Sequence, residues 1–213
     1  MVSPTTRSRP RRSDGEQTHT SILAAAVRLA SIEGLAGLSI GRLAEEVGVS
    51  KSGLYAHFGS KQQLQLDIIQ TARDIFEREV IEPALTAADG RPRLEALCES
   101  YISYIQAWVF PGGCFFAGML AEFDAQVGTP HQEITADQRD WTELLEAQAA
   151  QAQTNGELDP AADVSQLAFE LTAAIQLANY YFVLFRDPHV LHRARTAIRA
   201  AISRASKSTK VVT

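Results

Sequence analysis

Apolar residues recur along most of this chain with a period of about 3.6 residues, the pattern of helices that turn one face towards a core. The region after residue 90 shows it most clearly, with one apolar face that runs from Leu94 to Trp108. No stretch shows the alternation and hairpin turns of strands. The pattern predicts an all-α fold of about nine helices. We expect them at 16–33, 40–47, 51–58, 60–82, 94–108, 114–123, 131–154, 160–185 and 188–205.

Helix-capping residues lie close together between residues 39 and 60. Three serines are placed as N-caps, and two glycines can take the left-handed conformation that ends a helix. Two short helices joined by a tight turn, followed at once by a third helix, form a helix-turn-helix, whose second helix enters the DNA major groove. This segment therefore predicts a protein that reads DNA. The N-caps are Ser39, Ser50 and Ser60, and the glycines are Gly48 and Gly59.

The helix expected at 160–185 is apolar on nearly every side. A surface helix needs one apolar face, so a second face requires another burying surface. We expect this helix and the one at 188–205 to join the same helices of a second copy in a four-helix bundle across a two-fold axis. The chain is therefore predicted to be a homodimer. Apolar residues outside the main stripe are Phe169, Leu177, Tyr181 and Leu184.

Composition adds limits on class and compartment. At 213 residues, 46% hydrophobic and 21% charged, the chain is ordinary for a soluble globular protein. No apolar run approaches the roughly 20 residues of a membrane span, and the N-terminus is basic and polar, unlike a signal sequence. We expect a cytoplasmic protein with no membrane association. Two cysteines, Cys98 and Cys114, are too few for a disulfide framework.

The net charge of −5 is unevenly distributed. Residues 1–61 hold eight Lys/Arg and five Asp/Glu, which gives +3, and residues 62–213 hold twelve and twenty, which gives −8. Because binding to phosphates depends on the local field, a basic head on an acidic body is compatible with DNA binding. We expect a disordered basic arm at 1–15, which either follows DNA or stays solvated, a helix-turn-helix domain at 16–62, an effector-binding and dimerisation domain at 63–206, and a flexible tail at 207–213.

Residues 18–66 resemble the TetR/AcrR family of bacterial transcriptional regulators. The resemblance is carried by several short motifs in register, and a looser similarity continues in Pro111-Gly112-Gly113-Cys114-Phe115-Phe116, Trp141 and the break at 156–159. It implies an N-terminal DNA-binding domain and a C-terminal domain that senses small molecules. The matching motifs are Gly34, Ser39-Ile40, Leu43-Ala44, Gly48-Val49-Ser50, Leu54-Tyr55-Ala56-His57-Phe58 and Ser60-Lys61.

The second short helix supplies the candidate DNA contacts. Lys51 lies in its first turn, where it can reach guanine or a phosphate, and Ser52 can bond a base edge or a phosphate. Gly53 lets the backbone approach DNA closely. The resemblance implies phosphate contacts from Ser39, Tyr55 and Lys61, and His57 is a further candidate.

Three of these residues, and the nearby Arg42, have an alternative interpretation. Lys51 and Lys61 can be solvated surface charges, and Tyr55 can pack against the first helix. Arg42 faces outward, where it contacts either a phosphate or solvent.

Large aromatic residues with a few polar groups predict an effector pocket in the C-terminal domain, as the resemblance implies. For each ring alone, a place in the plain core is the alternative. We expect a small organic effector and no cofactor. The candidate pocket residues are Tyr101, Tyr104, Trp108, Phe115, Phe116, Met119, Phe123, Phe169, Tyr180 and Tyr181.

Two other residue patterns are weaker signals. Cys114 follows two glycines and is either a reactive sensor thiol or, as we favour, a buried structural one. His189 and His192 are too few to indicate a metal site, so a solvated face or a helix cap is favoured. No metal site is expected.

The sequence therefore predicts a homodimeric repressor that binds a near-palindromic double-stranded operator and is released by a small organic effector. An enzyme is disfavoured because neither a nucleophile elbow nor a phosphate loop is present. A non-specific architectural DNA binder would need excess positive charge and no large apolar domain. Activation rather than repression stays open as an alternative.

Overall fold

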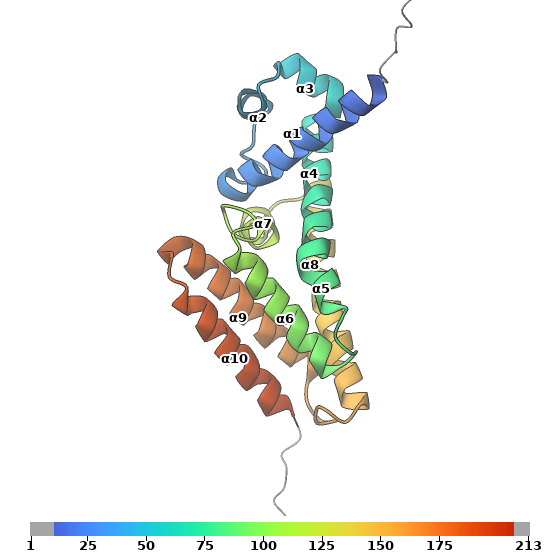
Figure 1. Cartoon of the computed structure of the whole chain (residues 1–213), viewed down its shortest axis with the longest axis vertical. Helices are drawn as coiled ribbons and strands as arrows, with labels where there is room; N and C mark the ends of the chain where they lie inside the picture. The colour runs from blue at the N-terminus through green and yellow to red at the C-terminus, as the bar shows by residue number, and fades with distance from the viewer. Residues whose placement is uncertain (1–10, 207–213) are drawn as a thin grey trace, which may run out of the picture.

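The computed structural model describes residues 11–206, with side chains from Gln17 onwards, and helices are the only regular structure in that range (Figure 1). The prediction of an all-α fold is confirmed. Because α4, η1 and α5 follow one another without a break, the described residues form nine helical segments. They are α1 (Arg11–Glu33), α2 (Ile40–Val47), α3 (Lys51–Phe58), α4 (Lys61–Phe76) with the π-helix η1 (Glu77–Ile81) and α5 (Glu82–Ala84), α6 (Arg91–Gln106), α7 (Phe115–Phe123), α8 (Thr129–Thr154), α9 (Val164–Phe185) and α10 (His189–Ala205).

The first three helices and the start of α4 form one end of the molecule, which we call the head, and the remaining helices form the body (Figure 1). The side chains of Ser39, Ser50 and Ser60 each accept a backbone N–H from three residues later, at 3.0–3.1 Å. Gly48 and Gly59 have positive φ angles of 68° and 71°. The predicted caps and helix ends are therefore confirmed. The core of this head includes Ile22, Ala26, Leu43, Leu54 and Phe58.

The other end of the molecule is a bundle in which α9 packs against α10, α8 and α6 (Figure 1). Leu171 and Ile175 of α9 are fully buried there. The opposite side of α9 is exposed although it is apolar, as its composition predicts. Its exposed large side chains are Phe169, Leu177, Tyr180, Tyr181, Leu184 and Phe185.

Several helix boundaries differ from the sequence prediction, three of them in ways that bear on the sites. α1 begins at Arg11, so residues 11–15 of the expected arm are helical, whereas 1–10 and the expected tail at 207–213 lie outside the described residues. α9 begins only at Val164, because the Asp163 side chain accepts a backbone N–H at 2.9 Å and caps the helix there. α6 ends at Gln106, so Trp108 lies beyond the helix, with a φ of 52°.

The long helix that leaves the head does not stop before Pro83, as expected, but passes through it to Ala84. A proline within a helix lacks an N–H and crowds the carbonyl of the preceding turn. Here the turn before it is the wider π-helix η1, a form that is often found at functional sites.

α9 is long and apolar enough to cross a membrane by length and composition, with a mean hydropathy of 1.3, which the sequence analysis did not recognise. One such helix is weak evidence, since a core helix of a soluble protein passes the same test. The packing of α9 on α10, α8 and α6 accounts for its buried side.

Candidate DNA interface and effector cavity

The helix α3 presents its polar side chains outward from a capped, buried frame. Leu54 and Phe58 anchor it in the head and are almost fully buried. Lys51, Ser52 and His57 are exposed, and Tyr55 is 53% exposed, so about half of the tyrosine is open to a partner. A helix held in this way can enter a groove without refolding.

The N-terminal turn of α3 is shaped by small neighbours. A Cβ atom on Gly41 of α2 would lie 3.0 Å from Cε of Lys51, so this glycine leaves room for the lysine stem. A Cβ on Gly53 would lie 3.2 Å from Oγ of Ser50, which caps the helix through the N–H of Gly53. Gly53 thus has a role in the cap beside the close approach to DNA that the sequence predicts. The hydroxyl of Ser52 lies 3.1 Å from that of Ser50.

The remaining candidate contacts lie at the end of α3 and at the starts of the two neighbouring helices. Lys61 is exposed and its Nζ donates to the carbonyl of Ala36 at 2.8 Å, which leaves other donors of the ammonium group unused by this bond. The ring of His57 lies near that of His19, with centroids 6.2 Å apart. Ser39 is exposed at the start of α2. Together these residues place hydroxyl, imidazole and ammonium groups around α3.

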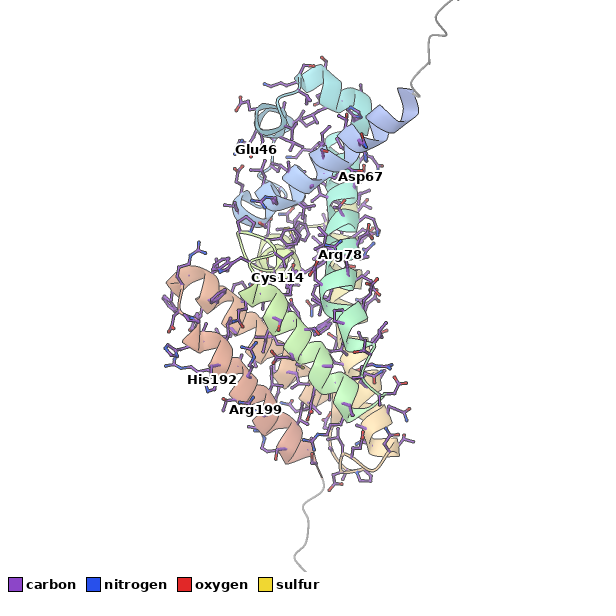
Figure 2. All side chains as sticks on the ribbon, in the orientation of Figure 1. Glu46, Asp67, Arg78, Cys114, His192 and Arg199 are labelled. Atoms are coloured by element: carbon purple, nitrogen blue, oxygen red, sulfur yellow. The ribbon has the colours of Figure 1, made fainter. Side chains whose placement is uncertain are left out.

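Arg42 does not project freely, because it forms ion pairs with Glu33 at 3.2 Å and Glu46 at 2.9 Å. Its hydrogen bond to Glu46 is the main cause that raises its pKa. Figure 2 labels Glu46 in the head, beside α2. Two carboxylates already neutralise this guanidinium, so we expect a weaker contribution to DNA binding than from Lys51 or Lys61.

The turn between α1 and α2, which we call the junction turn (residues 34–38), connects the head to the body. The carboxylate of Glu122 in α7 accepts the N–H of Leu35 at 2.9 Å and also that of Ala36. From α4, Gln65 donates to the carbonyl of Leu35 at 3.3 Å, and Lys61 to that of Ala36. The start of α4 in the head and α7 in the body therefore hold the same short turn.

A second contact joins head and body near the end of α1. The N–H of Gly112 donates to Oγ of Ser31 at 3.3 Å. A Cβ at Gly112 would lie 1.7 Å from the carbonyl oxygen of Ser31, so only glycine permits this approach.

A cavity of about 190 Å³ opens between α4, η1, α6, α7 and α8. Its aromatic wall is Phe76, Tyr101, Phe116 and Trp141, in which the ring centroid of Phe76 lies 5.0 Å from that of Tyr101 and 5.7 Å from that of Trp141. Edge-to-face pairs of this kind fix the ring positions. Ile81 and Leu144 add aliphatic surface, and the polar lining residues are Arg73, Glu77, Asp137, Gln138 and Asp140.

An ion pair closes one side of the cavity. Arg73 donates from Nε to Asp137 at 2.6 Å and from a terminal nitrogen to Glu133 at 3.1 Å, which ties α4 to α8. The hydrogen bond with Asp137 raises the pKa of Arg73. Burial raises the pKa of Asp137 even though Arg73 opposes that change. Burial therefore disfavours the ionised form of Asp137 more strongly than the ion pair with Arg73 favours it.

Of the predicted pocket residues, Tyr101 and Phe116 line this cavity. Tyr104, Phe115 and Met119 are buried but do not line it, and the ring of Tyr104 lies 5.8 Å from that of Phe76. Phe123 is also buried.

Trp108, Phe169, Tyr180 and Tyr181 do not line this cavity. Trp108 packs on Phe182 at 4.7 Å. Phe169 is 68% exposed on α9, and the hydroxyl of Tyr180 donates to the carbonyl of Ala117 at 2.8 Å.

Sequence reasoning did not identify Phe76, Arg73, Trp141 or Asp137 as cavity residues. Phe76 and Trp141 lie on the apolar faces of their helices, and Arg73 lies next to such a face. Periodicity does not distinguish a cavity wall from plain core. The pairing of Arg73 with Asp137 joins distant positions and has no local signal.

Cys114 lies in the interior of the molecule (Figure 2) and is 1% exposed. Its thiol lies 3.0 Å from the hydroxyl of Tyr101, and its N–H donates to the side chain of Asn179 at 2.8 Å. Burial raises its pKa, which suppresses the reactive thiolate. These observations favour the structural interpretation. Cys98 is buried too, and burial raises its pKa to about 12.

His192 lies on the outer side of α10 (Figure 2), and His189 is exposed at the start of the same helix. The N–H of His189 donates to the Asp187 side chain at 2.9 Å, which is a capping contact. Within residues 11–206 no group of three or more His, Cys, Asp or Glu is arranged to hold a metal ion.

Two family models match the chain. One, described as "Bacterial regulatory proteins, tetR family", matches residues 22–68, and one described as "Tetracyclin repressor-like, C-terminal domain" matches residues 90–198. The first covers the helix-turn-helix and the second most of the body.

Individual proteins show the same similarity. The HTH-type transcriptional activator FasR of Mycolicibacterium smegmatis is 31% identical over 91 residues, which is 43% of this chain and 42% of FasR, so the match spans less than half of that relative. A TetR transcriptional regulator from Chloroflexus aurantiacus has a similar fold, with a TM-score of 0.83 and 23% identity over 90% of this chain and 97% of that one. AibR, solved with isovaleryl coenzyme A and operator DNA, gives 0.66 and 23% over 85% and 95%.

Proposed function

Since this chain belongs to the TetR family of bacterial regulatory proteins and is a DNA-binding transcriptional regulator, we propose that it is a homodimeric repressor which a small organic effector releases from a near-palindromic operator. The observation that carries the proposal is the exposed polar face of α3 on a fully capped helix-turn-helix. The family assignment identifies a regulator and not an enzyme. We propose the cytoplasm as its place of action.

On this proposal, Lys51 and Ser52 read bases, while Ser39, Tyr55, His57 and Lys61 hold phosphates. Phosphate contacts fix the position of a protein on DNA, and base contacts give it sequence preference. Gly53 keeps the N-terminal turn of α3 open to the backbone of the DNA.

The exposed apolar side of α9 supports the homodimer. Phe169 and Leu184 are 68% and 70% exposed, and apolar side chains of this size on one helix favour burial against a second copy. Sedimentation velocity tests this with Leu184→Glu, which should give monomers. The matched control is Leu85→Glu, at a leucine 49% exposed beyond α5, which should stay dimeric. A dimer that persists in Leu184→Glu would contradict the α9 interface.

The cavity supports effector control, because its walls belong to the helices that hold the junction turn. Phe116 and Glu122 are both in α7, and Arg73 and Lys61 are both in α4. A ligand that binds one arrangement of these helices better than another shifts the protein towards it. AibR was solved with both isovaleryl coenzyme A and operator DNA, which suits a regulator with two sites.

The direct test is a mobility-shift titration with DNA from upstream of the protein's own gene, a scrambled competitor and two salt concentrations. We expect a discrete shift that resists the competitor and is lost in Tyr55→Ala but kept in Glu143→Ala, a change at an exposed residue on α8. If a random-sequence DNA selection also returns no preferred site, the proposal is wrong.

Activation is the second candidate, because FasR is named as an activator. Transcription in vitro from a promoter that carries the selected site separates the two. Repression lowers the transcript when protein is added, and activation raises it.

A further inference from the structure

The wall of the cavity is a set of aromatic rings with fixed orientations. The ring of Phe76 meets Tyr101, Phe116 and Trp141 edge to face, with interplanar angles of 83°, 86° and 86°. The indole N–H of Trp141 is directed at the hydroxyl of Thr172, at 3.3 Å. Aromatic faces carry negative partial charge and attract organic cations.

The charged groups of the lining are also predominantly negative. One cation, Arg73, stands against three carboxylates, those of Glu77, Asp137 and Asp140. Arg73 is already paired with Asp137 and with Glu133. Glu77 and Asp140 form no ion pair with any residue in the described part of the chain. The cavity therefore has an excess of negative charge beside an aromatic wall.

We propose that this cavity binds a small organic cation, with its apolar body against the aromatic wall and its positive charge towards Glu77, Asp137 and Asp140. The inference rests on the proposed function in taking the cavity as the effector site. An anion would meet three carboxylates and one guanidinium that is already paired. A neutral ligand would pack on the rings but would bring no positive charge to pair with the carboxylates.

The surroundings of Asp137 support a cation. Burial raises the pKa of this carboxyl against the effect of Arg73, so a further positive charge nearby stabilises the ionised form. The cavity volume of about 190 Å³ lies below the range of roughly 300–1,000 Å³ of most ligand sites, which fits a compact molecule with one ring.

A cation in this place also affects the head. It shares Asp137 with Arg73, and that ion pair fastens α4 to α8. α4 follows α3 directly, and Ser60 between them caps α4. A competing positive charge weakens the bond of Arg73 to α8, whereas a neutral ligand does not.

The test uses three probes of nearly equal shape and different charge. Benzyltrimethylammonium is positive, neopentylbenzene is its neutral carbon analogue, and benzylsulfonate is negative. Binding is followed by quenching of tryptophan fluorescence, because Trp141 lines the cavity and Trp108 does not. We expect the cation to bind the full-length protein at least about tenfold more tightly than either other probe.

The variant Glu77→Gln/Asp140→Asn removes the two unpaired carboxylates and leaves Arg73 with its partner. Both residues are exposed on helices, so the fold should tolerate the changes. The preference for the cation should fall at least about threefold, with little change for neopentylbenzene. Glu143→Gln is the matched control, an exposed carboxylate on α8 that does not line the cavity. It should keep the preference.

Two results would overturn the inference: no binding of benzyltrimethylammonium in preference to the other probes, or a preference that the double variant retains in full. Operator binding, measured on the same protein, keeps this separate from the proposed function. Specific operator binding together with a cavity that prefers the neutral or negative probe overturns the cation and leaves the regulator. A preferred cation that leaves operator affinity unchanged supports the ligand class and contradicts the effector role.

Discussion

A substitution of Glu122 is the most direct way to perturb the contact between the body and the head. Its carboxylate accepts two backbone N–H groups of the junction turn, from Leu35 and Ala36, and has no competing ion pair in the described part of the chain. Glu122→Gln keeps the shape of the side chain but removes its charge and turns one acceptor into a donor. A donor that faces an N–H cannot restore the lost bond.

The expected cost follows from these contacts. A hydrogen bond to a charged group contributes about 1.5–3 kcal/mol, and one of the two survives in part in the variant. We therefore expect the free energy of unfolding to fall by about 1–3 kcal/mol. The control Glu143→Gln, at an exposed carboxylate without a hydrogen bond among the described residues, should change it by less than about 0.5 kcal/mol.

Urea unfolding gives the free energy, and amide hydrogen exchange locates the change. The N–H groups of Leu35 and Ala36 should exchange faster in Glu122→Gln, while those in the middle of α9 should not. The reasoning is refuted if the variant is as stable as the Glu143→Gln control and the exchange of these two amides is unaltered. In that case the short contact with the turn contributes nothing to the junction.

Three further predictions concern the DNA interface and the bundle. Tyr55→Phe and Lys61→Ala should weaken binding to all operator variants alike, whereas Lys51→Ala should also change the base preference at one position. Titrations over single-base operator variants distinguish these outcomes. An unaltered base preference in Lys51→Ala would contradict the reading role of this lysine. The hydrogen bond from Arg195 lowers the pKa of Glu99. A carboxyl group with a lowered pKa stabilises the fold above the ordinary pKa of a glutamate, and this stabilisation is lost as the pH falls through the lowered value. Glu99→Gln should therefore cost about 0.5 kcal/mol or less at neutral pH, since the pair is partly exposed, and nothing in strong acid; equal losses at both pH values in urea unfolding would contradict this origin.

The head could be predicted from the sequence almost completely because its signals are local. A serine cap acts on an N–H three residues away, and a helix-ending glycine needs only its own φ angle. The cap at Ser50 and the helix end at Gly59 can therefore be predicted without knowledge of the fold. The start of α9 shows the limit, since both Asp159 and Asp163 are capping residues and the structure uses the second.

The cavity could be predicted only in part, because its walls come from helices far apart in the sequence. The apolar period placed Tyr101 on an inner face, and it does line the cavity. The same period placed Trp108 there, but α6 ends before it and the left-handed φ of 52° turns it towards α9. Phe169 shows the converse: an aromatic ring in an apolar helix that faces outward. Which ring faces a cavity depends on packing between helices, which no local pattern records.

The junction turn explains why the cavity and the DNA interface are mechanically connected on the proposed mechanism. Its carbonyl groups are held by Lys61 and Gln65 from α4, and its N–H groups by Glu122 from α7. The cavity is lined by these two helices together with η1, α6 and α8, so on the proposed mechanism a ligand that changed the separation of α4 and α7 would stretch these bonds or move the turn. Moving the turn displaces α2, whose first residue follows Ser39 directly, and with it the helix that braces α3. The close contact of Gly112 with Ser31 would hold the end of α1 against the body during this motion. On the proposed mechanism, a small shift at Arg73 would therefore change the angle of α3, and a dimer that reads two half-sites would lose its fit to the operator.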